Sequence, residues 1–188
     1  PNRCSFCSRS NLFPKTRIRP LQSIIKEIKQ IVSIGSYEVV NFYDNINLNR
    51  KFFQDFLQQL IEVPGMLPWG AELRADTITE KDAELMKRSN CSGIATGVET
   101  VDEEVLKFNG KYQNTAREKR GIEILKEAGM SVQLFFIVGL PAETPQTFQK
   151  TLDFVKSLPL KSGEDKLEFF LPTPYPGSDM VMHPEKYG

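Results

Sequence analysis

The chain has 188 residues, and its 24 Lys and Arg side chains balance 24 Asp and Glu side chains, giving a formal net charge of +0. This balance speaks against a nucleic-acid-binding protein, and no apolar run approaches the length of a membrane span or resembles a signal peptide. The length and a hydrophobic content of 40% suit a single globular domain, and three cysteines without a pairing framework suit a reducing cytoplasm.

The first motif along the chain is a Cys-x-x-Cys pair, Cys4 and Cys7. Such a pair can be half a zinc site, a redox dithiol or part of an iron–sulfur loop. Zinc is the least supported, because the rest of the sequence offers only the separate Cys91 and His183. A redox dithiol opens a helix directly, whereas residues 8–19 are polar, basic and interrupted by a proline. The pair alone leaves these interpretations open.

Helical and strand patterns then alternate along the chain. A helical face begins after a proline at residue 21, and Gly35 supplies its stop. Thr79 with Asp82 predicts a capping box, and Thr144 before a proline predicts another helix start. The predicted helices cover residues 21–32, 52–60, 80–86, 101–107, 115–128 and 145–157, and the predicted strands cover residues 37–43, 68–73, 93–98, 132–138 and 166–171.

Five strands that alternate with helices predict parallel β-α units. Right-handed crossovers between sequential neighbours favour a curved, barrel-like α/β sheet. In such barrels the chemistry takes place at the carboxyl face, where strands end and loops begin. We therefore look for functional residues at those positions.

The cysteine loop and three strand-end segments carry a resemblance to a known family. These segments are Gly97–Thr100, Gly139–Thr144 and Pro174–Ser178. They resemble the corresponding segments of radical S-adenosylmethionine (SAM) proteins, and more narrowly the branch that often carries an upstream cobalamin-binding domain. The cluster loop of that family reads Cys, three residues, Cys, two residues, Cys, so a third cysteine is expected immediately before Pro1.

The resemblance implies a partial (β/α)6 TIM-type barrel, whose first strand precedes the cysteine loop. Residues 1–188 would then be an N-terminally truncated radical SAM core domain that lacks this strand and is inactive by itself. The implied cofactors are a 4Fe-4S cluster and SAM. Three thiolates hold three irons and leave the fourth open to SAM. The implied reaction is reductive cleavage of SAM to methionine and a 5′-deoxyadenosyl radical, which abstracts hydrogen from a substrate.

The resemblance also implies roles for single residues. Cys4 and Cys7 resemble cluster ligands. Asp44 follows the strand predicted at 37–43, where family members bind the methionine amino group of SAM, and a carboxylate suits an ammonium group. This segment departs from the Gly-Gly-Glu type of many relatives, so an aspartate that merely stabilises a turn is an equal interpretation.

Two further charged residues follow strands. Glu99 resembles the acceptor of the ribose hydroxyl groups, against the alternative of an acidic residue at the start of a helix. Arg74 could orient the SAM carboxylate, or it could pair with Glu72 or Asp76, and we favour the structural pairing.

The last candidates are apolar or glycine residues. The resemblance places Ile137, Val138 and the Gly139 backbone at the adenine, although an apolar pair in a strand is ordinarily core. Gly139 and Gly177 would let the backbone approach a ligand closely, against the alternative of ordinary turn glycines.

The implied partners are a small-molecule substrate and a reductant such as ferredoxin or flavodoxin, with no membrane. An upstream cobalamin domain would favour methylation or ring rearrangement. An RNA-methylthiolating relative is a competing interpretation, to which the charge balance gives no support. A non-catalytic barrel that binds SAM or a partner protein is an alternative of a different class.

Overall fold

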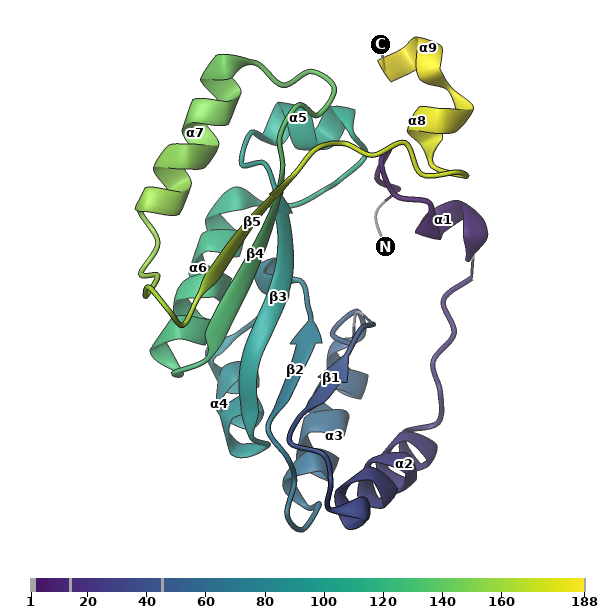
Figure 1. The fold of residues 1–188 in the computed structure, drawn as a ribbon, viewed down its shortest axis with the longest axis vertical. Coiled ribbons are helices and arrows are strands. Elements are labelled where there is room, and N and C mark those ends of the chain that lie inside the picture. The colour runs from purple at the N-terminus through teal and green to yellow at the C-terminus, as the bar shows by residue number, and fades with distance from the viewer. Residues whose placement is uncertain (1–2, 14, 45, 188) are drawn as a thin grey trace.

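The computed structural model describes residues 3–13, 15–44 and 46–187 and contains a five-stranded sheet covered by helices (Figure 1). The strands lie in sequence order, and every neighbouring pair is parallel. They are β1 (Val40–Phe42), β2 (Trp69–Glu72), β3 (Cys91–Glu99), β4 (Ser131–Ile137) and β5 (Lys166–Phe170). Sequential parallel strands require a crossover at each step, so the predicted α/β fold with parallel β-α units is confirmed.

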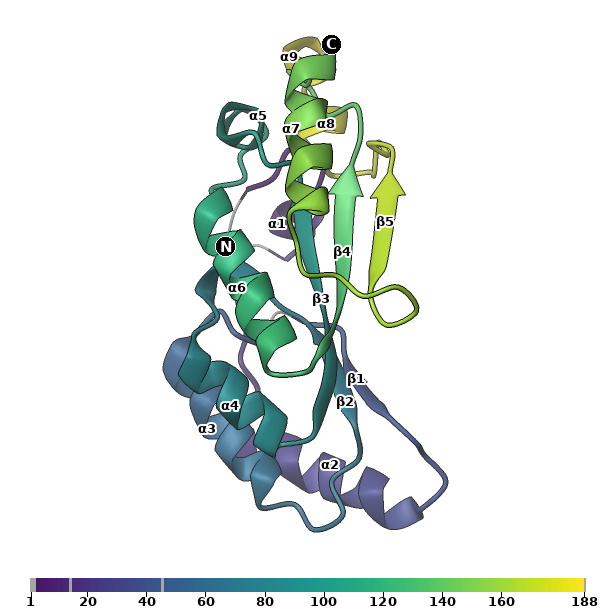
Figure 2. The same ribbon diagram turned by 90° about the vertical axis from the view of Figure 1, so that its left-hand side faces the viewer.

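The long helices that connect the strands lie along one side of the sheet (Figure 2). The described helices are α1 (Arg9–Leu12), α2 (Leu21–Ile34), α3 (Arg50–Ile61), α4 (Glu80–Arg88), α5 (Glu103–Phe108), α6 (Thr115–Glu127), α7 (Pro145–Lys156), α8 (Asp179–Met182) and α9 (Pro184–Tyr187), with a 3₁₀ turn η1 (Ala75–Thr77) after β2. Within the described residues, none of these helices has the length and apolar content needed to cross a membrane.

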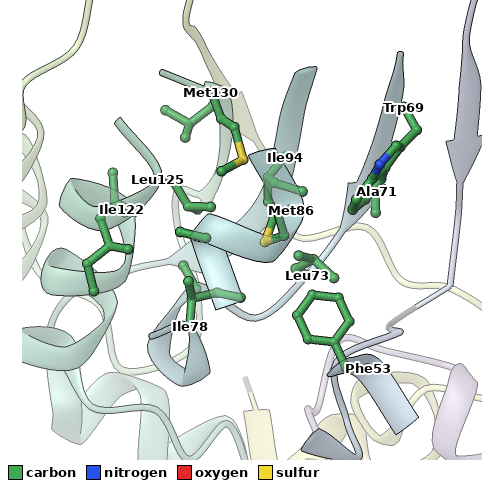
Figure 3. Close-up of a cluster of buried hydrophobic side chains, with 14 of the residues drawn as sticks. Phe53, Trp69, Ala71, Leu73, Ile78, Met86, Ile94, Ile122, Leu125 and Met130 are labelled. Atoms are coloured by element: carbon green, nitrogen blue, oxygen red, sulfur yellow. The ribbon is translucent and has the colours of Figure 1, made fainter. Parts of the chain in front are cut away.

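Burial alternates along the central strands because successive side chains point to opposite faces. On β3, Ile94 and Val98 are buried against the helices, whereas Gly93, Ala95 and Gly97 are half-buried on the other face. The apolar core therefore lies between the sheet and the helices (Figure 3). Small residues on the opposite face leave the backbone of β3 accessible there.

The predicted helix ends are confirmed where a specific cap was expected. Thr79 Oγ1 accepts a hydrogen bond from the backbone N–H of Asp82, and the Asp82 side chain accepts one in return. Thr144 caps α7 in the same way, with a proline in the first turn. Gly35 ends α2 in the left-handed conformation that glycine adopts without a steric penalty.

Two features differ from the predicted elements. A strand was predicted at 37–43, but in the structure it covers only Val40–Phe42. Its partner β2 has just four residues with which it can pair, and Tyr37 and Val39 are exposed. The four-residue helices α1, α8 and α9 were not predicted, since one turn is too short to show a helical period.

Candidate cofactor site at the carboxyl end of the sheet

The cysteine loop is fixed to the connection between α5 and α6. Its turn closes through a hydrogen bond from the Cys7 N–H to the Cys4 carbonyl, 3.1 Å long. Ser5 between them is buried, and its N–H and hydroxyl donate to the Asn109 backbone and side-chain oxygens at 2.8 and 2.7 Å. The Asn109 amide in turn donates to the carbonyls of Val105 and Pro141, both at 2.9 Å. Asn109 therefore joins the loop to the segments that follow β3 and β4.

Two more contacts hold the same loop. Gly110 adopts a φ of 68°, and a Cβ at this position would overlap the Arg3 carbonyl oxygen. On the other side, the Met180 N–H of α8 donates to the Ser5 carbonyl at 3.0 Å. The loop is thus enclosed by residues from the middle and the end of the chain.

Glu99 lies at the carboxyl end of β3 with an unusual backbone. Its φ is 64°, and the pairing between β3 and β4 shifts register at this point. The nearly buried Lys111 donates to Glu99 Oε1 at 2.9 Å and to the Gly97 carbonyl at 2.5 Å. A Cβ on Gly97 would overlap the Glu99 carboxylate, so the carboxylate lies directly over the glycine backbone. The left-handed backbone and the lysine together fix the direction of this side chain.

The charges around Cys4 connect the loop with Glu99. Burial is the main cause that raises the pKa of the Cys4 thiol to about 11; Glu99 and Cys7 raise it further, while Lys111 and Arg74 lower it. Charged groups that follow β2 and β3 therefore act on the Cys4 thiol. Burial also raises the pKa of the distant Cys91 to about 12, which suits a structural thiol.

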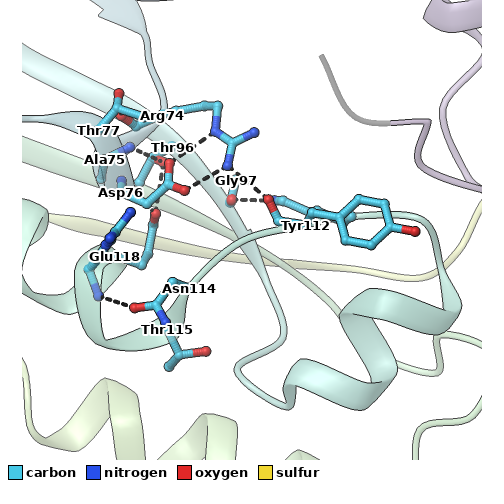
Figure 4. A network of polar contacts seen from close by, with 12 residues as sticks. Arg74, Ala75, Asp76, Thr77, Thr96, Gly97, Tyr112, Asn114, Thr115 and Glu118 are labelled. Atoms are coloured by element: carbon cyan, nitrogen blue, oxygen red, sulfur yellow. Dashed lines mark hydrogen bonds and ion pairs between the residues drawn. The ribbon is translucent and has the colours of Figure 1, made fainter.

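Arg74 belongs to a network at the end of β2 (Figure 4). Its guanidinium donates to both Asp76 carboxylate oxygens, at 2.9 and 2.6 Å, and to the Tyr112 carbonyl at 3.1 Å. The Asp76 N–H donates to Glu118 Oε2 at 2.9 Å, and the Thr96 hydroxyl donates to Glu118 Oε1 at 3.0 Å. Of the two expected pairing partners, Asp76 is the one that Arg74 contacts.

Asp44 joins the site through α1. Its exposed carboxylate pairs with Arg9, which follows the cysteine loop by two residues. The residue after β1 is therefore linked to α1, although Arg9 and Asp44 are 35 positions apart in the chain.

The end of β4 supplies the apolar part of the site. Ile137 and Val138 are half-buried rather than core, and the Val138 N–H donates to the Phe170 carbonyl at 2.8 Å. Gly139 has a φ of 84°, and its N–H donates to Glu143 Oε2 at 2.5 Å.

Gly177 lies at the opposite side of the cysteine loop, in the connection between β5 and α8. It has a φ of 82°, and a Cβ at this position would lie 3.8 Å from the Leu12 side chain and 4.0 Å from Ser8. The chain before α8 therefore packs against α1 directly after the cysteines.

The residues present fit a metal–sulfur cofactor with an additional polar ligand. Within the described ranges, no three His, Cys, Asp or Glu side chains form a metal site, and Cys4 and Cys7 are both free thiols. In the same part of the chain, two buried side-chain oxygens lack a hydrogen-bond partner, Ser178 Oγ and Glu143 Oε1. Both belong to strand-end segments of this site. Buried polar atoms are ordinarily paired, so these two indicate that a further polar group belongs here.

Sequence reasoning missed Ser5, Asn109, Lys111, Glu118 and Ser178. One signal could have placed the connection between α5 and α6 at the site. The short helix α5 begins just after the carboxyl end of β3, so the chain that leaves it is still close to that end. Nothing in the local pattern identifies Lys111 as the partner of Glu99, since the two side chains meet only in the folded chain.

Fold and site together define a class of protein: a parallel β/α barrel-type domain that gathers two thiols, an acidic strand end and a buried lysine at the carboxyl ends of its strands. The chain belongs to the radical SAM superfamily, whose family model matches residues 1–155.

The curated relatives include a methyltransferase, a cyclase and a tRNA-modifying enzyme. An uncharacterized methyltransferase of Pyrococcus horikoshii is 29% identical over 180 residues, covering 95% of this chain and 38% of the relative. The anaerobic magnesium-protoporphyrin IX monomethyl ester cyclase of Rubrivivax gelatinosus is 28% identical, covering 96% and 32%. The tRNA-2-methylthio-N(6)-dimethylallyladenosine synthase of Lachnoclostridium phytofermentans is 33% identical, covering 90% and 39%. The chain spans less than two fifths of the length of each of these relatives.

Solved structures show the same fold. The radical SAM methyltransferase TsrM of Kitasatospora setae, with tryptophan and a SAM analogue bound, matches with a TM-score of 0.80 and 19% identity over 98% of this chain and 37% of that chain. Another structure of TsrM holds cobalamin and a [4Fe-4S] cluster. Coproporphyrinogen III oxidase from Escherichia coli, also a radical SAM enzyme, matches with a TM-score of 0.68 and 18% identity over 98% of this chain and 44% of that chain.

Proposed function

We propose that this domain holds a [4Fe-4S] cluster through Cys4 and Cys7 and cleaves SAM reductively. The observation that carries the proposal is the cysteine loop, which hydrogen bonds to Asn109 and Met180 hold at the carboxyl end of the sheet. When bound and reduced, such a cluster supplies the electron that converts SAM to methionine and a 5′-deoxyadenosyl radical. The protein itself positions the reactants and excludes water.

In this proposal Glu99 accepts the ribose hydroxyl groups. Lys111 and the left-handed backbone hold Glu99 Oε1, which fixes the carboxylate while its second oxygen can accept from a ligand. Charge-assisted hydrogen bonds of this kind are about twice as strong as neutral ones. Lys111 thus acts on SAM through Glu99, as a positioning residue.

The other proposed SAM contacts are assigned from the positions of residues at the ends of the strands. Asp44 is exposed and would exchange its pairing with Arg9 for the methionine ammonium group. Arg74 keeps its pairing with Asp76 and presents the remaining edge of the guanidinium to the SAM carboxylate. The adenine would lie on the strand end formed by the half-buried side chains of Ile137 and Val138 and the backbone of Gly139. Gly177 would let the chain before α8 pass close to the ligand.

The substrate would enter along the sheet face that the helices leave uncovered. Gly93, Ala95 and Gly97 line this face in β3, and Gly70 continues it in β2. Small residues give a small organic molecule access to the radical, and a low-potential protein such as ferredoxin or flavodoxin would supply the electron. Activity in the cytoplasm remains a prediction.

We further propose cobalamin-linked methylation or ring rearrangement as the reaction of the whole protein. The methyltransferase and cyclase relatives support this reaction class, each aligning with at least 95% of this chain. Methylthiolation of RNA is the second candidate, because the tRNA-modifying relative is 33% identical. The balanced charge of the chain favours the small-molecule substrate.

The full-length protein, reconstituted anaerobically with iron and sulfide and reduced with dithionite, tests the proposal. It should release 5′-deoxyadenosine from SAM, measured by mass spectrometry. Cys4→Ala and Cys7→Ala should abolish this release through loss of a ligand, whereas Cys91→Ala, at the far end of β3, should not. A wild-type protein that binds SAM but releases no more 5′-deoxyadenosine than Cys4→Ala would make a non-catalytic SAM-binding barrel the better account.

A further inference from the structure

Ser178 has a buried hydroxyl group that the fold does not use. The residue is 0% exposed, and its Oγ has no hydrogen-bond partner within the described residues. A buried hydroxyl without a partner costs roughly 1 to 3 kcal/mol, so natural proteins seldom keep one without a reason.

Its place in the chain makes the missing bond more informative. Ser178 is the N-cap residue of α8, where a serine side chain ordinarily accepts a bond from the second or third N–H of the helix. Here the Met180 N–H donates to the Ser5 carbonyl, and the Val181 N–H donates to the Ser178 carbonyl. The hydroxyl is therefore released from capping by the same bond that attaches α8 to the cysteine loop.

This bond also brings the residues around Ser178 to the cysteine loop. Ser5 lies between Cys4 and Cys7, and its carbonyl is 3.0 Å from the Met180 nitrogen, two residues after Ser178. The preceding Gly177 faces the Ser8 and Leu12 side chains, directly after the second cysteine. The segment around Ser178 thus contacts both the cysteine loop and α1.

We propose that Ser178 Oγ–H donates a hydrogen bond to a sulfide of the cluster. This inference rests on the cluster of the proposed function and assigns a further positioning residue to it. A hydrogen bond to sulfur stabilises the more negative, reduced state and so raises the reduction potential. Ser178 would make the cluster easier for the electron donor to reduce.

The test uses the full-length protein with its cluster, prepared as Ser178→Ala and as the isosteric pair Ser178→Thr and Ser178→Val. Redox titration followed by electron paramagnetic resonance measures the reduction potential. At a fixed potential, the ratio of reduced to oxidised cluster should fall about fivefold to tenfold in the alanine and valine variants and stay within about twofold of wild type in the threonine variant. Ser89→Ala, which removes another buried serine hydroxyl far from the loop, should lower stability without changing the potential.

The outcomes separate this inference from the proposed function. Unchanged potentials in Ser178→Ala and Ser178→Val, with full iron content and normal 5′-deoxyadenosine release in wild type, would overturn the inference alone. A wild-type protein that holds no cluster would overturn both. Loss of iron from the alanine and valine variants but not from threonine would support the hydroxyl role, whereas equal loss from all three would show that the position serves packing only.

Discussion

Glu118 on α6 should give the folded domain an unusual pH dependence, because its carboxyl group is buried. The side chain is 1% exposed, and burial raises its pKa from the ordinary 4.5 to about 7, opposed by Lys111 and by hydrogen bonds from Thr96 and Asp76. The unfolded chain loses this proton near pH 4.5, while the folded chain keeps it up to about pH 7. Between these values the unfolded state binds fewer protons, so stability falls as pH rises.

The size of this effect follows from the pKa change. Each unit of pKa corresponds to about 1.4 kcal/mol, so the rise to about 7 corresponds to about 3 kcal/mol lost between pH 4.5 and pH 7. Glu118→Gln keeps an acceptor for the Asp76 N–H and a donor for the Thr96 hydroxyl oxygen without a proton to lose. The variant should match wild type near pH 4.5 and exceed its stability by up to about 3 kcal/mol at pH 8.

Urea unfolding of both proteins under reducing conditions, from pH 4.5 to pH 8, measures this difference directly. Glu127→Gln is the control on the same helix, because Glu127 is exposed and pairs with Arg120 at the solvent-exposed surface, where ion pairs contribute little to stability. A stability difference between Glu118→Gln and wild type that stays constant over the whole pH range would refute the reasoning.

Two further predictions concern the site. Asn109→Ala removes three side-chain hydrogen bonds and should lower the free energy of unfolding by about 3 kcal/mol. It should also speed the alkylation of Cys4 by iodoacetamide, and an unchanged alkylation rate would show that Asn109 does not hold the loop. Glu99→Gln should weaken SAM binding by about 1 to 3 kcal/mol in titration calorimetry with iron content unchanged, since a charged acceptor is lost. Unchanged affinity would remove Glu99 from the ribose site.

The sequence predicted those features that depend on near neighbours. The capping box of Thr79 and Asp82, the glycine stop at Gly35 and the alternation of strands and helices each follow from residues a few positions apart. The position of Glu99 at a strand end followed as well, because parallel strands present their carboxyl ends at one edge. The resemblance to radical SAM proteins, seen in the cysteine loop and three strand-end segments, is confirmed by the family model.

Long-range pairing could not be predicted in the same way. Ser5 and Asn109 are 104 positions apart, and their mutual hydrogen bonds exist only because the loop after α5 returns to the carboxyl end of β3. The sequence offered both Glu72 and Asp76 as ion-pair partners of Arg74. The 3₁₀ turn after β2 contains Asp76, and Arg74 pairs with this residue. Lys111 had no local signal, since its partner Glu99 lies across a short helix.

The cysteine loop depends on the rest of the fold for its conformation. Its four-residue turn has one internal backbone bond, from Cys7 to Cys4, whereas its bonds to Asn109 and Met180 come from segments far away in the chain. Ordering such a short loop costs about 1 to 2 kcal/mol per residue, which the distant contacts must offset. A change at Asn109 should therefore affect both stability and cysteine reactivity. A change confined to the Ser178 hydroxyl leaves the Met180 bond in place and should act on the cofactor without loosening the loop. The two variants therefore distinguish a residue that orders the loop from one that acts on its cofactor.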